Sequence, residues 1–223
     1  MINCKIDMII KKGTVKILNK KLYFITDSTD IDNQTFLNKV EQACRGGIDI
    51  LQLREKSGSD KDMLDLAFKV KEITDRYNIP FIIDDRIDIA KIAGCGVHLG
   101  QNDIPVKYAR QILGKDAVIG ATAKTVEQAE NALEQGANYL GVGAIYPTTT
   151  KVITIRTSIS TLNDICSLSD VPVFAIGGLN SSNIDILKGS DIAGICVVSA
   201  IMKSENPHDA TIKLKEKMNA VFA

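Results

Sequence analysis

Hydrophobic residues along this chain fall into short continuous runs, and each run is followed by a segment in which apolar residues recur at helical spacing. In residues 62–77, for example, Met63, Leu66, Val70 and Ile73 follow one another at intervals of three or four. Such spacing is typical of a helix with one buried face, whereas continuous β-branched runs are typical of strands buried on both faces. The pattern therefore predicts strands and helices that alternate along most of the chain.

We predict eight strands, and a helix after each of them. The predicted strands cover residues 22–26, 48–53, 81–84, 96–99, 117–121, 138–143, 173–176 and 194–199. The predicted helices cover residues 36–45, 62–77, 88–93, 106–113, 126–135, 161–167, 182–188 and about 209–221.

Eight such units without a break in composition favour one closed (β/α)8 barrel, the TIM-barrel class, because strands buried on both faces belong to parallel sheets. An open doubly wound sheet is the alternative, but no G-x-G-x-x-G follows the first predicted strand. We assign residues 21–223 to a single barrel domain and residues 1–20 to an N-terminal extension outside the repeating pattern.

Composition limits the kinds of partner. Of 223 residues, 45% are hydrophobic and 24% charged, and 27 Lys and Arg balance 27 Asp and Glu. A neutral balance gives no reason to expect binding to nucleic acid or to an anionic membrane, so any cationic site must be local. The pattern does not decide the oligomeric state, and a homo-oligomer stays open.

The cysteines and the N-terminus indicate a reducing compartment. Five cysteines are scattered without C-x-x-C spacing, which argues against a disulfide framework and a zinc site. Cys196 lies inside an apolar run and is expected to be a small core residue. The basic first twenty residues contain no apolar stretch long enough for a signal peptide or membrane span. We therefore expect a cytoplasmic protein.

In a (β/α)8 barrel the chemistry lies at the carboxyl ends of the strands, and the polar residues at these positions form a short set. Alternation along the second strand places Gln52, Arg54 and Lys56 on one side, facing the barrel mouth. The remaining candidates follow the other strands: Asp84, Asp85, Asp103, Thr122, Gly177, Gly178, Val198 and Ser199.

The segment after the sixth strand, GVGAIYPTTTK, is the richest of these positions. It leads through Pro147 into Thr148, Thr149 and Thr150 and ends at Lys151. Three hydroxyls and an ammonium group after a proline suit a phosphorylated ligand. An ordinary polar loop is the alternative.

Each candidate also has an ordinary structural interpretation. Arg54 and Lys56 could be solvated loop charges, and the three aspartates could be helix N-caps. Carboxylates at adjacent strand ends beside cations are, however, also the ligands that a Mg²⁺ ion bridging phosphate oxygens requires. Gly177-Gly178 could be a tight turn, or could let a phosphate approach backbone N–H groups at a helix N-terminus. Together these residues predict a mouth with two anion sites and a place for a metal.

The ordered motifs QLREK, DDRIDIA, GVHLGQND, IGAT, GVGAIYPTTTK, PVFAIGGL and GICVVSAI resemble those of the thiamine-phosphate synthase family. The resemblance runs from about Leu22 to the last predicted helix. It implies a transferase that couples 4-amino-5-hydroxymethyl-2-methylpyrimidine diphosphate to 4-methyl-5-(2-phosphoethyl)thiazole, or to its carboxylated form. The implied products are thiamine monophosphate and pyrophosphate, and the implied step is pyrophosphate loss to a pyrimidine carbocation.

The resemblance also implies roles for the candidates. Asp85 and Asp103 would hold Mg²⁺, and Lys151, Thr122 and Arg54 would be catalytic. Residues expected to bind the pyrimidine diphosphate are Gln52, Arg54, Lys56, Asp84, Thr122 and Lys151. Residues expected to bind the thiazole phosphate are Thr148, Thr149, Thr150, Gly178, Val198 and Ser199.

The chain departs from the family pattern at four places. Asp84 stands where the family usually has Asn, Thr122 where it has Ser, and Lys124 where it often has His. The run VITIRTSIS after Lys151 replaces a Gly/Pro-rich loop. A thiazole tautomerase-like relative and a non-catalytic thiazole or thiamine phosphate-binding barrel are the alternatives. The missing His disfavours the first, and retention of Lys151 and Asp85 disfavours the second.

Overall fold

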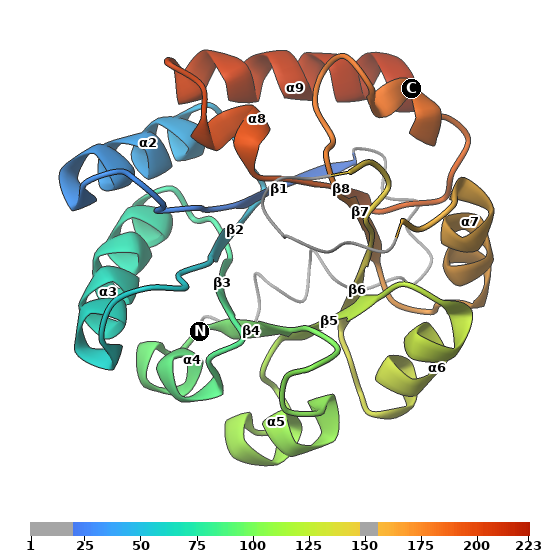
Figure 1. The fold of residues 1–223 in the computed structure, drawn as a ribbon, viewed down its shortest axis with the longest axis horizontal. Helices are drawn as coiled ribbons and strands as arrows, with labels where there is room; N and C mark the ends of the chain where they lie inside the picture. The colour runs from blue at the N-terminus through green and yellow to red at the C-terminus, as the bar shows by residue number, and fades with distance from the viewer. Residues whose placement is uncertain (1–19, 148–155) are drawn as a thin grey trace.

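The protein folds as a closed barrel of eight parallel strands, in which neighbours along the chain are also neighbours in the sheet. The computed structural model describes residues 20–147 and 156–223. The barrel closes where the last strand pairs with the first, Tyr23 lying opposite Cys196. Figure 1 shows the strands as a ring with the helices around it. The predicted (β/α)8 fold is confirmed.

The strands agree with the predicted ones to within about two residues at most ends. They are β1 Lys21–Ile25, β2 Ile50–Leu53, β3 Phe81–Asp84, β4 Gly96–Leu99, β5 Ile119–Ala123, β6 Tyr139–Gly143, β7 Val173–Ile176 and β8 Gly194–Val197. All end at the same rim, so that the side chains that follow them meet in one place.

The helices follow the strands in sequence and lie outside them in space. They are α2 Asn33–Arg45, α3 Asp60–Arg76, α4 Ile87–Ala93, α5 Val106–Leu113, α6 Val126–Glu134, α7 Ile159–Leu168, η1 Ile184–Leu187, α8 Ser199–Met202 and α9 Pro207–Phe222. Two predictions need correction. The helix expected at 182–188 is only the short 3₁₀ helix η1, and Ser199, predicted as the last residue of the eighth strand, instead opens α8, a helix of four residues.

Two hydrophobic cores follow from the alternation of side chains along the strands. One lies between strands and helices and includes Phe36, Leu51 and Leu140. The other fills the barrel interior with Tyr23, Tyr139 and Phe174, among others. Cys196 belongs to this inner core and is 3% exposed, which confirms its expected place. The inner core forms the base on which the functional site stands.

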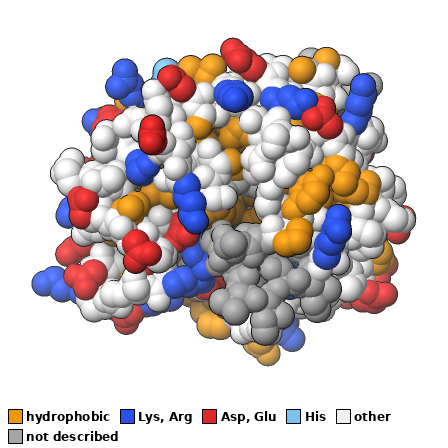
Figure 2. Space-filling model, turned by 45° about the horizontal axis from the view of Figure 1, so that its top comes forward, with side chains coloured by type: hydrophobic (Ala, Val, Ile, Leu, Met, Phe, Trp, Pro, Cys, Tyr) orange, Lys and Arg blue, Asp and Glu red, His pale blue; other side chains and the backbone are white. Residues whose placement is uncertain are grey.

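Charged residues of both signs are mixed over the face of the molecule shown in Figure 2, in keeping with their equal numbers. Within the described parts of the chain, no helix is both long and apolar enough to cross a membrane. The assignment of residues 1–20 to an extension concerns residues that, apart from Lys20, lie outside the described ones.

Candidate active site

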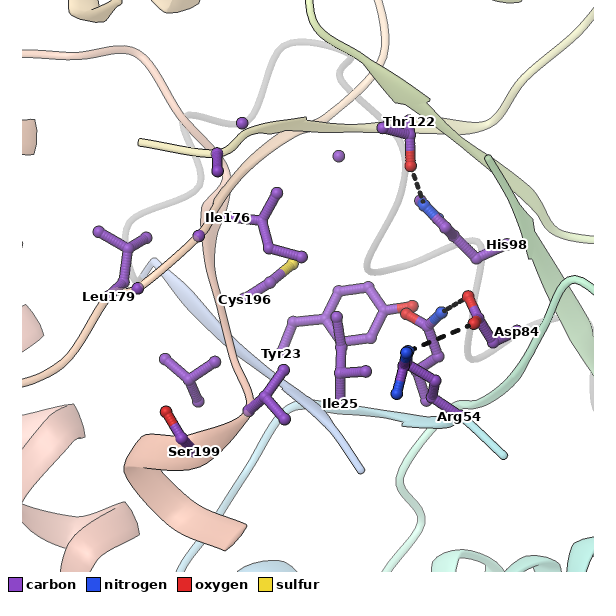
Figure 3. A pocket seen from close by; sticks show the side chains of 18 of the residues that line it. Tyr23, Ile25, Arg54, Asp84, His98, Thr122, Ile176, Leu179, Cys196 and Ser199 are labelled. Atoms are coloured by element: carbon purple, nitrogen blue, oxygen red, sulfur yellow. Dashed lines mark hydrogen bonds and ion pairs between the residues drawn. The ribbon is translucent and has the colours of Figure 1, made fainter. Parts of the chain in front are cut away.

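A cavity opens at the carboxyl ends of the strands, and every strand of the barrel contributes to its lining. It holds about 1030 Å³ of space, including its open mouth. Figure 3 shows Asp84, His98 and Thr122 on one side, and Leu179 and Ser199 on the other. Eight of the candidate residues line it: Gln52, Arg54, Asp84, Thr122, Gly177, Gly178, Val198 and Ser199.

A cluster that we call the charged wall consists of Arg54, Lys56, Asp84, Asp85 and Asp103. Arg54 and Asp84 line the cavity, whereas Lys56, Asp85 and Asp103 do not line it but contact one another or Asp84. Arg54 Nε lies 3.9 Å from Asp84 Oδ2, and Lys56 Nζ lies 2.8 Å from the same oxygen. The Lys56 ammonium also donates a hydrogen bond to Asp85. The ends of β2 and β3 therefore join as predicted, with cations and carboxylates in direct contact.

The charged groups of this wall shift one another's pKa values. Burial lowers the pKa of the Lys56 ammonium, but the hydrogen bonds and charges of Asp84 and Asp85 outweigh burial and leave that pKa raised. Burial, and then a hydrogen bond with Asp85, raise the pKa of the Asp103 carboxyl. Two carboxyl groups this close favour a proton or a cation between them.

The three aspartates are not helix caps. The N-cap of α4 is Arg86 and that of α5 is Pro105, and neither makes a side-chain capping bond. Asp85 adopts a left-handed backbone with φ of 61°, which is uncommon outside glycine and found at functional sites. The capping interpretation of these residues is therefore wrong.

Gln52 is buried at the base of the charged wall, with 2% exposure. Its Nε2 donates to Asp84 Oδ1 at 2.6 Å, while its Oε1 has no hydrogen-bond partner in the described structure. An ionised carboxylate only accepts hydrogen bonds, so Asp84 fixes which end of the amide faces it. The carbonyl end of Gln52 remains as an unsatisfied acceptor, which is costly unless a ligand donates to it.

Thr122 lies in a hydrogen-bonded group that the sequence alone did not reveal. Its hydroxyl is 2.9 Å from His98 Nε2, and His98 Nδ1 is 3.1 Å from the Tyr139 hydroxyl. The register of the barrel brings these residues together, because His98 lies opposite Gly120 and Gly120 opposite Tyr139. A histidine between Val97 and Leu99 in a strand buried on both faces needs polar partners inside the barrel.

The opposite side of the cavity, which we call the neutral wall, consists of Gly177, Gly178, Val198 and Ser199. Gly178 has a φ of +61°, and a Cβ atom there would lie 2.7 Å from the Pro147 carbonyl oxygen. Gly177 is equally constrained, with a φ of +109° and a Cβ position 2.5 Å from Ala144. The glycine pair is therefore required by both backbone conformation and space.

The other predicted residues divide into two groups. Lys124, which replaces the histidine of the family pattern, lines the cavity next to Thr122 and adds a cation there. Thr148, Thr149, Thr150 and Lys151 lie outside the described residues, so their predicted roles stay predictions.

Known proteins match this chain over most of its length. A family model described as thiamine monophosphate synthase matches residues 22–201. Thiamine-phosphate synthase 2 of Streptococcus pneumoniae is 46% identical over 204 residues, which cover 91% of this chain and 97% of that protein. The thiamine-phosphate synthase of Methanobrevibacter smithii is 43% identical over 204 residues, with the same coverage of 91% and 97%.

Among solved structures, thiamine phosphate pyrophosphorylase from Pyrococcus furiosus superposes with a TM-score of 0.82 at 32% identity. The match covers 93% of this chain and 98% of that one. The two synthases are thus similar to this chain in sequence, and the solved structure is similar in fold, along nearly their whole length.

Proposed function

This chain belongs to the thiamine monophosphate synthase family, and we propose that it joins a pyrimidine diphosphate to a thiazole phosphate to form thiamine monophosphate and pyrophosphate. The observation that carries this proposal is the charged wall, where Arg54 and Lys56 lie against Asp84, Lys56 also contacts Asp85, and Arg54 and Asp84 line the cavity. Cations in that position suit a reaction whose main cost is charge on a leaving group.

Gln52 and Asp84 support a pyrimidine substrate. The unsatisfied Gln52 Oε1 needs a donor, and the exocyclic amino group of an aminopyrimidine is one. Asp84 takes the place of the usual Asn and, as an acceptor alone, holds the Gln52 amide in the orientation that leaves this oxygen free. The departure from the family pattern at position 84 thereby strengthens the recognition of an amino group.

The proposed reaction begins when the bond between the pyrimidine methylene carbon and the diphosphate oxygen breaks, and the electron pair leaves with pyrophosphate. The ammonium of Lys56, the guanidinium of Arg54 and the hydroxyl of Thr122 stabilise that charge. Lys151, outside the described residues, is proposed to do the same. The lone pair of the thiazole nitrogen then forms the new C–N bond to the methylene cation.

We further propose that Asp85 and Asp103 hold Mg²⁺. Their carboxyl groups hydrogen-bond to each other, and this contact contributes to the raised pKa of Asp103. Two carboxyl groups this close repel each other when both are ionised, and a bound cation would relieve that repulsion. Among the described residues no three or more His, Cys, Asp or Glu side chains form a metal-binding group. The proposal therefore rests on two carboxylates, and Mg²⁺ can bind through one or two carboxylates together with waters and substrate phosphates. When bound, Mg²⁺ would neutralise diphosphate charge.

The neutral wall is proposed to hold the thiazole phosphate. Gly178 allows close approach to backbone N–H groups, and Ser199 adds a hydroxyl at the start of α8. A place in the cytoplasm is also proposed, because the four cysteines of the described residues (Cys44, Cys95, Cys166 and Cys196) are free thiols.

The test is a reaction of the purified chain with both substrates and Mg²⁺, in which pyrophosphate and thiamine monophosphate are measured together. Equal amounts of the two products, formed only when both substrates are present, are expected. Tight binding of thiazole phosphate without any pyrophosphate release would contradict a synthase and favour a binding barrel. In the same assay, Asp85→Asn is expected to raise the Mg²⁺ concentration for half-maximal rate by about tenfold or more.

A further inference from the structure

Four side chains that line the cavity form a continuous series of hydrogen bonds that ends at Thr122. The Tyr23 and Tyr139 hydroxyls are 2.8 Å apart, and the series continues through His98 to Thr122. All four side chains line the cavity, but Tyr23 and Tyr139 are only 1% and 2% exposed. The series therefore links a buried interior to the place where the diphosphate is proposed to leave.

Two glycines leave the space that this series needs. A Cβ atom at Gly120 would lie 2.0 Å from the Tyr139 ring, and one at Gly141 would lie 3.2 Å from the His98 ring. Real Cβ atoms do not approach ring carbons to 2.0 Å, so any other residue at 120 would displace Tyr139. Gly120 and Gly141 thus leave the space that the Tyr139 and His98 rings occupy.

The hydrogens of the series can be placed by accounting for donors. Burial raises the pKa of both Tyr23 and Tyr139, so each hydroxyl keeps one hydrogen to donate. Within the described residues, the Tyr23 hydroxyl has the Tyr139 hydroxyl as its hydrogen-bond partner and no other. A buried donor left without an acceptor is costly, so Tyr23 donates to Tyr139.

The remaining directions follow from that first one. Because Tyr139 accepts from Tyr23, its own hydrogen goes to His98 Nδ1, which must then be an unprotonated acceptor. The neutral imidazole carries its hydrogen on Nε2 and donates it to Thr122 Oγ1. The Thr122 hydrogen is then left to point into the cavity.

We propose that Tyr139 and His98 are positioning residues that hold Thr122 with its hydroxyl hydrogen directed at the leaving diphosphate. The proposal rests on the function proposed above. With the opposite directions, Thr122 would donate to His98 and present lone pairs to an anion, which repels it. Fixing the hydrogen before the substrate arrives removes the need to reorient the hydroxyl when charge develops.

The first test is nitrogen NMR of the unliganded protein, which distinguishes the two neutral tautomers of histidine. The chain has two histidines, and His208 lies at the surface beside Asp209. The His208→Gln variant therefore assigns the remaining signals to His98. We expect the Nε2–H tautomer of His98; the Nδ1–H tautomer, or an even mixture, would overturn the proposal.

The second test compares two variants that each delete one buried hydroxyl from the series. In Tyr139→Phe the contact to His98 Nδ1 is lost, so a mixture of tautomers and a roughly tenfold lower kcat are expected, with KM values within about twofold. In Tyr23→Phe, Tyr139 still has His98 as its acceptor, so the tautomer is kept and kcat changes by less than about twofold.

Equal kcat values in the two variants would overturn the positioning role. Circular dichroism of both variants separates this result from a folding defect, and the wild-type tautomer decides the direction of the series even if neither variant folds. Failure of the proposed function gives a different outcome, in which wild-type protein releases no pyrophosphate while the tautomer is still measured.

Discussion

The two walls of the cavity differ in how they would bind a phosphate. The charged wall holds two cations, Arg54 and Lys56, against three carboxylates, so by formal count it has one more negative charge than positive. The neutral wall has no ionisable side chain and offers Ser199, backbone and space. Of the two walls, only the neutral wall can bind an anion without an accompanying cation.

This difference indicates a division of labour. A wall with excess carboxylate repels a diphosphate unless a cation comes with it, which makes binding there conditional on Mg²⁺. The charged wall is therefore suited to the diphosphate that leaves, and the neutral wall is suited to the phosphate that stays in the product. Substitutions on each wall should therefore affect different substrates.

The largest effect is expected from Lys56→Ala. It removes the ammonium that contacts both Asp84 and Asp85 and leaves these carboxylates less compensated. We expect kcat/KM for the pyrimidine diphosphate to fall by roughly 10²–10³ in steady-state assays. Lys69→Ala, on the exposed face of α3, is the control and should match wild type. A loss confined to KM for the thiazole phosphate would contradict the division.

A smaller effect is expected from Gly178→Ala. The new Cβ would sit 2.7 Å from the Pro147 carbonyl oxygen at a φ of +61°, so the neutral wall must shift. We expect thiazole phosphate to bind about tenfold more weakly by calorimetry, and stability to fall by about 1–3 kcal/mol.

Gly94→Ala is a matched control for that substitution. Gly94 has nearly the same φ, +64°, but nothing lies within 4 Å of its Cβ position. The Gly94→Ala variant should lose a similar amount of stability, because its backbone is similarly strained, and its thiazole phosphate binding should not change. Weakened binding in both variants would attribute the effect to general destabilisation.

The smallest effect is expected from Asp103→Asn in the absence of Mg²⁺. Because the folded pKa of Asp103 is raised, its protonated form favours folding at low pH, and that contribution is lost as the pH rises through the folded pKa. The variant should therefore melt about 1–2 °C higher than wild type near neutral pH, and this gain should vanish as the pH falls toward about 4.

Thermal melting at several pH values measures this gain, with the exposed Asp191→Asn as control. Asp191 lies outside the charged wall, so its variant should show no pH-dependent gain. A gain that persisted at low pH would show that repulsion between Asp85 and Asp103 is not its source.

The order and type of the strands could be predicted from sequence because each is a short, largely apolar run followed by a segment with helical spacing. The helix expected at 182–188 could not, since Asn180, Ser182 and Asn183 hydrogen-bond to local backbone and side chains instead. The charged wall was predictable from strand alternation at Gln52 and Arg54. The partnership of Thr122 with His98 was not, because it depends on the register between strands.

The division between the walls is tested most directly by measuring the binding of each substrate alone, with Mg²⁺, to wild type, Arg54→Ala and Ser199→Ala. Calorimetry should show that Arg54→Ala weakens the binding of the pyrimidine diphosphate by about tenfold or more. The affinity for thiazole phosphate should stay within about twofold of wild type. Ser199→Ala should weaken the binding of thiazole phosphate by roughly two- to tenfold and leave the affinity for the pyrimidine diphosphate unchanged. If both variants weakened the same substrate, the two walls would not serve two substrates.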